Sequence, residues 1–279
     1  MKLVKIMLVN MEEIFDKLNE NEAVLHFNIN NLEWAKYILE VAREENTSVI
    51  LGVSESAIKY MGGYKTVYNL VSGLVLDLNI KIPVVLHLDH GHSIESCKKA
   101  IDAGFTSVMI DASSLPLSEN IEITKQVAYY AKTKNVTVEA ELGSMDAYQK
   151  TNPKEVKEFV LKTGIDALAP SIGNAHGIYK GEVRLDIPLI LEIAKMVDIP
   201  LVLHGGTGIP DSQIKDAIKS GIKKININTE LQTSWAGAVR EYIINNKDVY
   251  DPRKIISSGE IELKNKVKEK IRLCKNNNI

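Results

Sequence analysis

Residues 84–111 have the sequence VVLHLDHGHSIESCKKAIDAGFTSVMID, which predicts a strand, a helix and a second strand in succession. Val84–Asp89 is an apolar, β-branched run, and Ser107–Asp111 is another. Between them, Ile94–Ala103 has the apolar spacing of an amphipathic helix, and Gly104 follows it where a glycine commonly ends a helix. This order of elements predicts two neighbouring parallel strands joined by a helix.

The same alternation continues along the whole chain of 279 residues. The other predicted strands are Ala23–Ile29, Ser48–Val53, Thr137–Leu142, Ala167–Ile172, Leu201–His204 and Lys224–Asn228. The other predicted helices are Leu32–Asn46, Ile121–Asn135, Lys154–Thr163, Ile187–Val197 and Asp211–Ser220. Eight such units predict an α/β protein, a (β/α)8 TIM barrel with residues 1–279 as a single domain. The alternative is an open doubly wound sheet, whose reversal of strand order a sequence cannot reveal.

The C-terminal segment extends the predicted fold, and the composition of the whole chain argues against several classes of protein. Residues 259–278 predict a final amphipathic helix, which would form a C-terminal extension of the barrel. The net charge of -2 argues against a nucleic-acid-binding surface. Cys97 and Cys274 match no zinc or redox spacing, so we expect reduced thiols and a cytoplasmic protein. We expect neither a signal peptide nor a membrane span, because every apolar run is too short.

Polar side chains gather where the predicted strands end, which in a barrel is the rim that carries the active site. His90, His176 and His204 follow or end three different strands, and Asp111 and Glu141 end two more. Such a cluster would be unneutralised without a cation. Zinc suits imidazole ligands, and catalytic zinc keeps three protein ligands and one open position. The alternative is that each histidine is a hydrogen-bonded core or rim residue. The joint pattern favours a catalytic zinc site.

Two further histidines flank this cluster. Because side chains alternate along a strand, a regular third strand would point His87 to the same side as Asp89 and His90 to the opposite side. We therefore expect His87 in the core or behind the site, and His92 on the rim.

The loops after the seventh and eighth predicted strands favour an anion site. Residues 205–208 are Gly-Gly-Thr-Gly and precede a predicted helix start, and residues 226–229 are Asn-Ile-Asn-Thr. Glycines let backbone N–H groups approach an anion, and barrels often bind phosphate after these strands. The alternative is a tight turn that needs glycine only for its positive φ.

Taken together, these motifs resemble the class II, zinc-dependent fructose-bisphosphate and tagatose-bisphosphate aldolases. The similar segments lie in family order along nearly the whole chain and are 52–55, 60–63, 87–91, 103–111, 138–143, 176–181, 204–208, 225–229 and 250–254. The resemblance implies a cytoplasmic lyase of glycolysis and carbohydrate metabolism that cleaves fructose 1,6-bisphosphate to dihydroxyacetone phosphate and glyceraldehyde 3-phosphate. It also implies a homo-oligomer, a dimer or a tetramer.

The resemblance also implies roles for single positions. His90, His176 and His204 match the zinc ligands, Asp111 and Glu141 match residues that bind a second divalent metal or hold an alternative zinc position, and Asp89 matches the acid/base acting on the C4 hydroxyl. The matches to the dihydroxyacetone-phosphate site are Gly177, Gly205, Gly206, Thr207, Asn226, Ile227, Asn228 and Thr229, usually beside a monovalent cation, Na+ or K+. Arg253 is our candidate for the second phosphate, or else a surface residue at a helix start.

The chain departs from the family in the segment after Glu141. Residues 144–153 lack the double glycine and are about ten residues shorter than the mobile loop that often carries the C3 proton-exchange carboxylate. Asp146 is a candidate replacement, or else a solvated turn residue. Ser114 and His92 also differ from common family residues. The hypotheses are a fructose-bisphosphate aldolase, an aldolase for tagatose 1,6-bisphosphate or another ketose phosphate, and a sugar-phosphate-binding barrel of weak activity.

Overall fold

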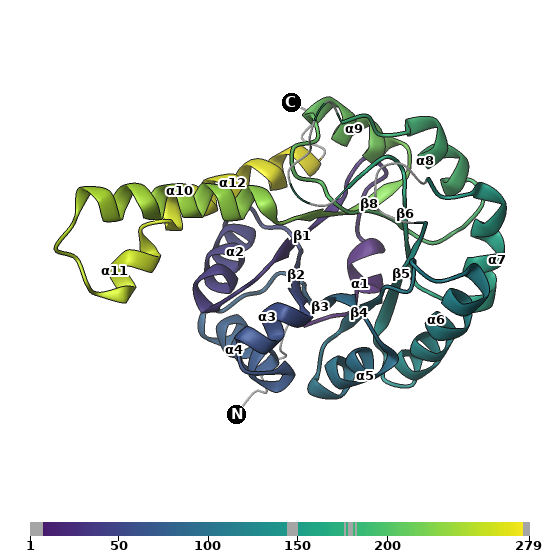
Figure 1. Cartoon of the computed structure of the whole chain (residues 1–279), viewed down its shortest axis with the longest axis horizontal. Helices are drawn as coiled ribbons and strands as arrows, with labels where there is room; N and C mark the ends of the chain where they lie inside the picture. Colours follow the sequence, from purple (N-terminus) through teal and green to yellow (C-terminus); the bar gives the residue numbers. More distant parts are fainter. Residues whose placement is uncertain (1–7, 144–149, 176, 178–180, 182, 276–279) are drawn as a thin grey trace.

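The computed structural model describes residues 8–143, 150–175, 177, 181 and 183–275, and its strands close into one parallel barrel (Figure 1). In order around the barrel the strands are β1 Val24–Asn28, β2 Val49–Ser54, β3 Val84–Gly91, β4 Ser107–Ile110, β5 Thr137–Leu142, β6 Ala167–Pro170, β7 Leu201–Leu203 and β8 Ile222–Ile227. The eighth strand pairs with the first, since Val24 lies opposite Lys224. The predicted (β/α)8 barrel is therefore confirmed, and the open-sheet alternative is wrong.

Helices surround this barrel. They are α1 Glu12–Phe15, α2 Leu32–Glu44, α3 Glu55–Tyr60, α4 Tyr64–Asp77, α5 Ile94–Ala103, α6 Leu117–Lys132, α7 Pro153–Thr163, α8 Ile187–Ala194, α9 Asp211–Lys219, α10 Thr229–Asn245, α11 Pro252–Ser257 and α12 Glu260–Cys274. The predicted bounds of α5 agree with the structure, with Ser93 capping its start and Gly104 in the left-handed conformation at its end. The helices α3 and α4 fill the long β2–β3 connection, for which we had predicted no helix. Among the described residues, no helix has both the length and the apolar character that a membrane span needs.

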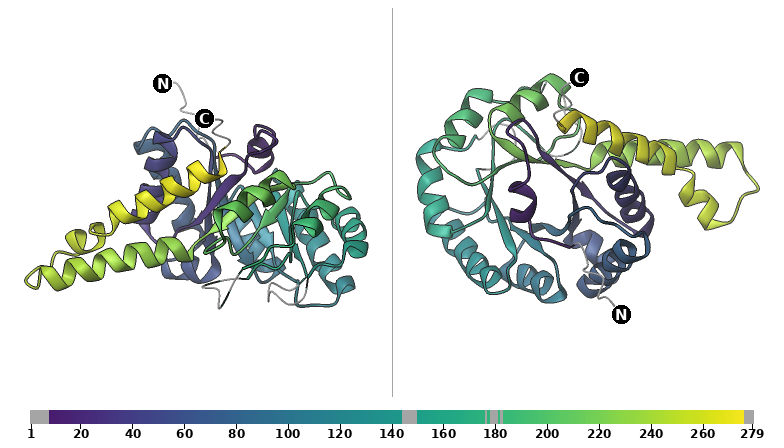
Figure 2. Two further views of the ribbon diagram at one scale, coloured as in Figure 1. Left: turned by 90° about the horizontal axis from the view of Figure 1, so that it is seen from above. Right: turned by 180° about the vertical axis from the view of Figure 1, so that it is seen from behind.

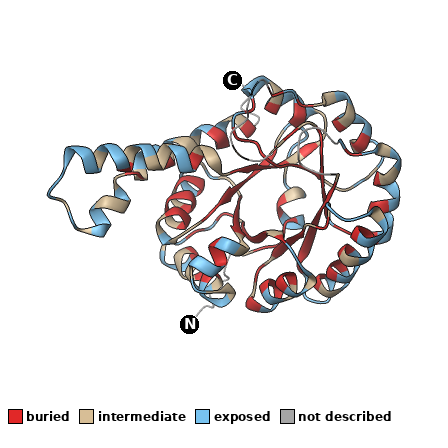
Figure 3. Cartoon of the chain, viewed as in Figure 1, coloured by how far each residue is buried: buried red, intermediate tan, exposed pale blue. Residues whose placement is uncertain are grey.

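The last three helices form an arm that leaves the barrel (Figure 1). Figure 2 shows α10 extending outward to α11, and α12 returning beside α10 to the barrel wall, where it packs against α2. The predicted C-terminal helical extension is therefore confirmed, with α12 as its inner part. Figure 3 shows that the strands are buried while the far part of the arm is largely exposed.

The barrel interior changes from apolar to polar along its axis. At the amino-terminal end lies an apolar layer formed by Val24, Ile50 and Val85. This layer is covered by Ile14 of α1 and by Met11, which precedes the helix. Because inward-facing residues are two positions apart in a strand, the next layer holds the fully buried polar residues His26, His87, Glu139 and Lys224. The layer after that reaches the carboxyl-terminal rim with Asn28, Asp89, Glu141 and Asn226.

The close contact between Gly52 and His26 gives a test of this packing. A Cβ atom on Gly52 would lie 1.7 Å from His26 Nε2 in the next strand, so Gly52→Ala must displace the imidazole. We expect a loss of about 1–3 kcal/mol in the free energy of unfolding, measured by urea denaturation. In a His26→Ala background the loss should largely vanish. Gly73→Ala is the control, because a Cβ there meets no atom within 4 Å. An equal loss in both backgrounds would contradict this packing.

Candidate active site

The end of β3 departs from regular strand geometry, and this departure shapes the site. His90 has a positive φ of 50°, and the pairing of β3 with β4 shifts register between Leu88 and Gly91. As a result Asp89 and His90 line the same pocket, instead of facing opposite sides as alternation in a regular strand predicts. His87 is fully buried in the barrel, as expected, and its Nδ1 lies 2.9 Å from Ser107 Oγ. His92 is exposed on the rim, also as expected.

His90 and His204 bring two imidazole nitrogens together over the barrel axis. His90 Nε2 and His204 Nδ1 are 3.1 Å apart. Two imidazole nitrogens bound to one tetrahedral zinc, with bonds of about 2.0–2.1 Å, would be about 3.3 Å apart. The other nitrogen of each ring contacts a carboxylate, His90 Nδ1 with Asp111 Oδ2 at 2.9 Å and His204 Nε2 with Glu139 Oε1 at 2.7 Å. Carboxylates in these positions are typical partners of metal-binding histidines.

Acidic groups surround this histidine pair and fit a divalent cation. Potential ligand atoms of Asp89, His90 and His204 lie within 4.8 Å of one another, as do those of His90, Asp111 and Glu141. The Oε2 atom of Glu141 is buried and has no hydrogen-bond partner among the described residues, which suits an oxygen that would face a cation. His176, the third predicted ligand, lies outside the described residues.

Burial and the neighbouring charges of the site shift the pKa values of its ionisable side chains. Burial by itself would lower the pKa of His90, but the hydrogen bond to Asp111 and the charge of Asp89 raise it to about 9. Burial and the neighbouring Asp111 raise the pKa of Glu141 to about 8. For Asp89, burial opposes ionisation, yet nearby histidines and a hydrogen bond from Asn28 lower its pKa below the usual range. Burial lowers the pKa of His26 to about 4.

Most of the predicted substrate-binding residues line one pocket of about 210 Å³ beside the histidines. The predicted residues that line it are Asp89, His90, His204, Gly177, Gly205, Thr207, Asn226, Asn228 and Thr229. Three of the predicted substrate-binding residues do not line this pocket. Gly206 packs against β8, where a Cβ would lie 2.9 Å from Asn226 O, and Ile227 belongs to the hydrophobic core. Arg253 lies on α11 in the exposed arm, paired with Asp251.

The half of the pocket that is predicted to bind phosphate lies at the start of α10. Asn228 is the N-cap residue of this 17-residue helix, and its own side chain makes no capping hydrogen bond to the described residues. In the glycine-rich loop, Gly206 N donates to Asn226 O and Gly208 N donates to Glu230 Oε1, so these two N–H groups are already engaged. In the first turn of α10, Glu230 N donates to Thr207 Oγ1 and Leu231 N donates to Asn228 O. Among the described residues, the N–H groups of Thr207 and Thr229 are therefore the better donors for an anion, and the positive end of the helix dipole favours one there.

Sequence reasoning missed several residues that the structure brings to the site. Asn28, Asn30 and Ser54 line the pocket from the ends of β1 and β2, and Asn28 Nδ2 donates to Asp89 Oδ2 at 2.7 Å. Ser113 Oγ bridges the two carboxylates of the rim, 2.8 Å from Asp111 Oδ1 and 3.0 Å from Glu141 Oε1. Asn28 lies near the end of the first predicted strand, and Ser54 directly follows the second. Their polar side chains at these positions were the signal in the sequence that could have identified them as rim residues.

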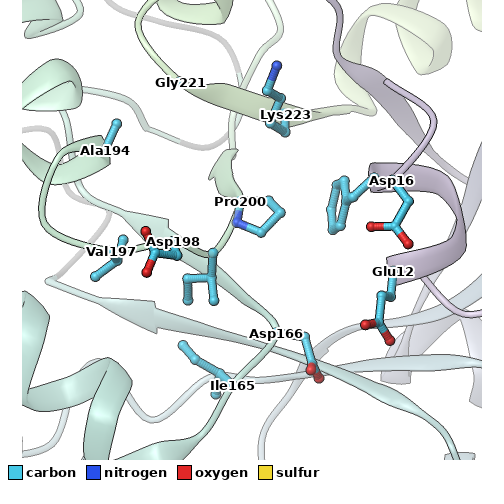
Figure 4. Close-up of a pocket in the computed structure, with 12 residues that line it drawn as sticks. Glu12, Asp16, Ile165, Asp166, Ala194, Val197, Asp198, Pro200, Gly221 and Lys223 are labelled. Carbon is cyan, nitrogen blue, oxygen red and sulfur yellow. The ribbon is translucent and has the colours of Figure 1, made fainter. Parts of the chain in front are cut away.

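A larger pocket of about 500 Å³ lies at the opposite end of the barrel. Figure 4 shows Glu12 of α1 and Asp16, which follows this helix, across the pocket from Asp198 and Pro200, with Lys223 above. Its walls come from α1 and from segments that precede or begin β6, β7 and β8. Because barrel active sites lie at the carboxyl ends of the strands, size does not make this pocket the catalytic one.

A possible metal site at the carboxyl-terminal rim, next to a helix start suited to an anion, is the arrangement expected of a metal-dependent barrel enzyme. Comparison with known proteins narrows the class. Residues 9–279 match the family described as fructose-bisphosphate aldolase class-II, and this chain belongs to that family, whose members are metal-dependent lyases.

The relatives of this chain support the assignment over nearly its full length. The chain is 53% identical to a fructose-bisphosphate aldolase of Geobacillus stearothermophilus over 275 residues, which covers 95% of this chain and 96% of that protein. A fructose-bisphosphate aldolase of Staphylococcus epidermidis is 54% identical with the same coverage. Among solved structures, the YdjI aldolase of Escherichia coli K12 is 33% identical, with a TM-score of 0.87 and coverage of 97% of this chain and 98% of that one.

The histidine pair can be tested by metal content. Because His90 and His204 would each supply one metal ligand, replacing either by alanine should weaken zinc binding by more than the ~10–100-fold expected for losing an outer-shell partner. Zinc affinity can be measured by competition with a chromogenic chelator. His92→Ala is the matched control, since this exposed histidine lies two residues away and should not matter. Unchanged affinity in His204→Ala would exclude the pair as ligands.

Proposed function

We propose that this chain is a zinc-dependent ketose-bisphosphate aldolase that cleaves fructose 1,6-bisphosphate reversibly to dihydroxyacetone phosphate and glyceraldehyde 3-phosphate. The observation that carries the proposal is the placement of Asp89 beside the histidine pair in one pocket. The names of the relatives support fructose 1,6-bisphosphate as the first substrate to test. An aldolase for tagatose 1,6-bisphosphate or another ketose phosphate remains the second candidate, because the segment 144–153 departs from the family pattern.

His90, His176 and His204 would hold the zinc, with Asp111 and Glu141 available to a second divalent metal or an alternative zinc position. When bound there, zinc supplies a Lewis acid that stabilises negative charge on the ketone half of the substrate. The donor set fits, because the two described imidazoles already present nitrogens at a separation suited to one ion. Asp146, the candidate for proton exchange at C3, lies outside the described residues.

Asp89 would act as the base on the C4 hydroxyl. Its Oδ2 is held by Asn28 Nδ2 at 2.7 Å, and its Oδ1 lies 3.5 Å from Asn226 Nδ2. In the cleavage direction Asp89 accepts the C4 hydroxyl proton, C4 becomes the aldehyde carbonyl, and the electron pair of the C3–C4 bond stays with the ketone half. The lowered pKa of Asp89 keeps it ionised and ready to accept this proton.

The substrate phosphate would bind at the start of α10, with Gly177, Gly205 and Thr207 around it. Within the described part of the chain, the buried oxygens Asn226 Oδ1 and Asn228 Oδ1 have no hydrogen-bond partner. Buried acceptors of this kind suit substrate hydroxyl groups, or a monovalent cation such as Na+ or K+ beside the phosphate. Anchoring the phosphate orients the reacting carbons toward Asp89, which lowers the entropic part of the barrier.

Activity and its dependence on metal test this function. We expect the zinc-loaded protein to cleave fructose 1,6-bisphosphate in a coupled assay, and chelation to abolish cleavage until zinc is restored. Asp89→Asn should lower kcat by ~10²–10⁴-fold while the protein still binds zinc, because only proton transfer is lost. Cleavage of only another ketose phosphate would favour the second candidate. Full activity after chelation, or an imine trapped by borohydride, would contradict the zinc mechanism.

The position of Arg253 leads us to propose that the protein works as a homo-oligomer, a dimer or a tetramer. The Arg253 side chain is 89% exposed and belongs to α11 in the arm, and it does not line the pocket of its own chain. If Arg253 binds the second phosphate, it must do so in the site of a second copy, which the projecting arm is placed to reach. Cys97 and Cys274 are buried free thiols, which supports the proposed cytoplasmic location.

Mixed oligomers test whether Arg253 acts in another copy. Asp89→Asn and Arg253→Ala chains are each purified, then mixed, dissociated and reassociated. In a two-fold dimer, random pairing should give about a quarter of wild-type sites, because each mixed dimer combines an intact Asp89 with an intact Arg253. Activity of the mixture should therefore exceed the mean of the two separate variants, measured at low fructose 1,6-bisphosphate. An activity equal to that mean would place Arg253 outside the partner's site.

A further inference from the structure

Beneath the pocket, two charged side chains face each other across the barrel interior. Glu139 on β5 and Lys224 on β8 are both fully buried, and Lys224 Nζ lies 2.7 Å from Glu139 Oε2. Glu139 Oε1 in turn lies 2.7 Å from His204 Nε2. The contacts connect Lys224 through Glu139 to His204, and none of the roles assigned so far uses Lys224.

The chemistry of these contacts fixes the protonation of His204. An ionised carboxylate only accepts hydrogen bonds, so the imidazole nitrogen that contacts Glu139 must carry the proton. That nitrogen is Nε2, which leaves the lone pair of Nδ1 facing His90 Nε2 at 3.1 Å. The contact with Glu139 thus selects the tautomer of His204 that can bind a metal through Nδ1.

Lys224 supplies what Glu139 needs to stay in this position. A buried carboxylate without a counter-ion is strongly disfavoured and would become protonated or turn away. The ammonium of Lys224 neutralises Glu139 and holds its second oxygen, so both oxygens of the carboxylate are fixed in direction. The layer below is apolar, and a hydrophobic pair of similar volume would often stabilise a fold as well or better. Stability alone therefore does not explain why two charges stand here.

We propose that Glu139 and Lys224 are positioning residues for His204: they hold its tautomer and ring orientation so that Nδ1 is presented to the metal. The proposal rests on the proposed function in one respect, that zinc binds at His204. Neither residue touches the substrate. Glu139 acts through His204, and Lys224 acts through Glu139.

A purely electrostatic role for Lys224 makes the opposite prediction. If Lys224 only placed positive charge near the metal, removing that charge would tighten zinc binding, because like charges repel. If Lys224 positions Glu139, removing it should weaken zinc binding. The sign of the change in Lys224→Met therefore distinguishes the two roles.

The experiment measures zinc dissociation constants by chelator competition on the full chain. We expect Lys224→Met and Glu139→Gln each to weaken zinc binding by ~10–100-fold, the range for outer-shell partners of metal-binding histidines, and Lys224→Arg to recover most of the loss. Lys264→Met is the control, because Lys264 also loses an ion pair, at 2.7 Å from Glu40 Oε2, far from the pocket. Zinc affinity equal to or tighter than wild type in Lys224→Met would overturn the proposal.

Two further measurements keep the result interpretable. If a single variant fails to fold because it leaves one buried charge unpaired, Lys224→Met combined with Glu139→Gln removes both charges and should fold, still with weakened zinc binding. Nitrogen-15 NMR of the zinc-free wild type should show His204 protonated at Nε2, and protonation at Nδ1 instead would overturn the proposal. Wild-type protein that binds no zinc would contradict the proposed function itself, whereas wild-type binding with unchanged variants would contradict only the positioning roles.

Discussion

His90 adopts a left-handed backbone conformation at the end of β3, and the geometry of the pocket depends on it. In a regular strand neighbouring side chains face opposite sides, so Asp89 and His90 could not share one site. The positive φ of 50° turns His90 toward His204 while Asp89 stays directed into the barrel mouth. A non-glycine residue in this region costs about 1–3 kcal/mol and persists where its surroundings fix it. Here the hydrogen bond between His90 Nδ1 and Asp111 helps to fix it.

The closed barrel connects this local geometry to the rest of the chain. Inward-facing residues recur at every second position. The strands β1 and β3 therefore each contribute one residue, Val24 or Val85, to the apolar layer and the next inward residue, His26 or His87, to the polar layer. Val24, His26 and Asn28 of β1 show the full gradient from the plugged end to the pocket. Stability comes mainly from the apolar layer and from the packing of helices on the outside of the strands, while metal and substrate chemistry is confined to the rim.

Much of this arrangement could be predicted from the sequence, for physical reasons that differ between elements. The βαβ unit of residues 84–111 was predictable because buried parallel strands are apolar throughout and because Gly104 marks a helix end. The convergence of His90 with His204 followed from the shared rim of a barrel. The positive φ of His90 was not predictable, because the residue at this position is a histidine and not a glycine. Neither was the pairing of Glu139 with Lys224, because the two residues are 85 positions apart and only barrel closure brings them together.

We expect one metal ion to lie between His90 Nε2 and His204 Nδ1, above the buried Glu139. Crystals grown with zinc and measured on both sides of the zinc absorption edge test it most directly. We expect one strong anomalous peak about 2.0–2.1 Å from both of these nitrogens, with His204 Nε2 still directed to Glu139. A principal peak at the buried cluster of His26, His87 and Asp89, or zinc bound through His204 Nε2, would contradict it.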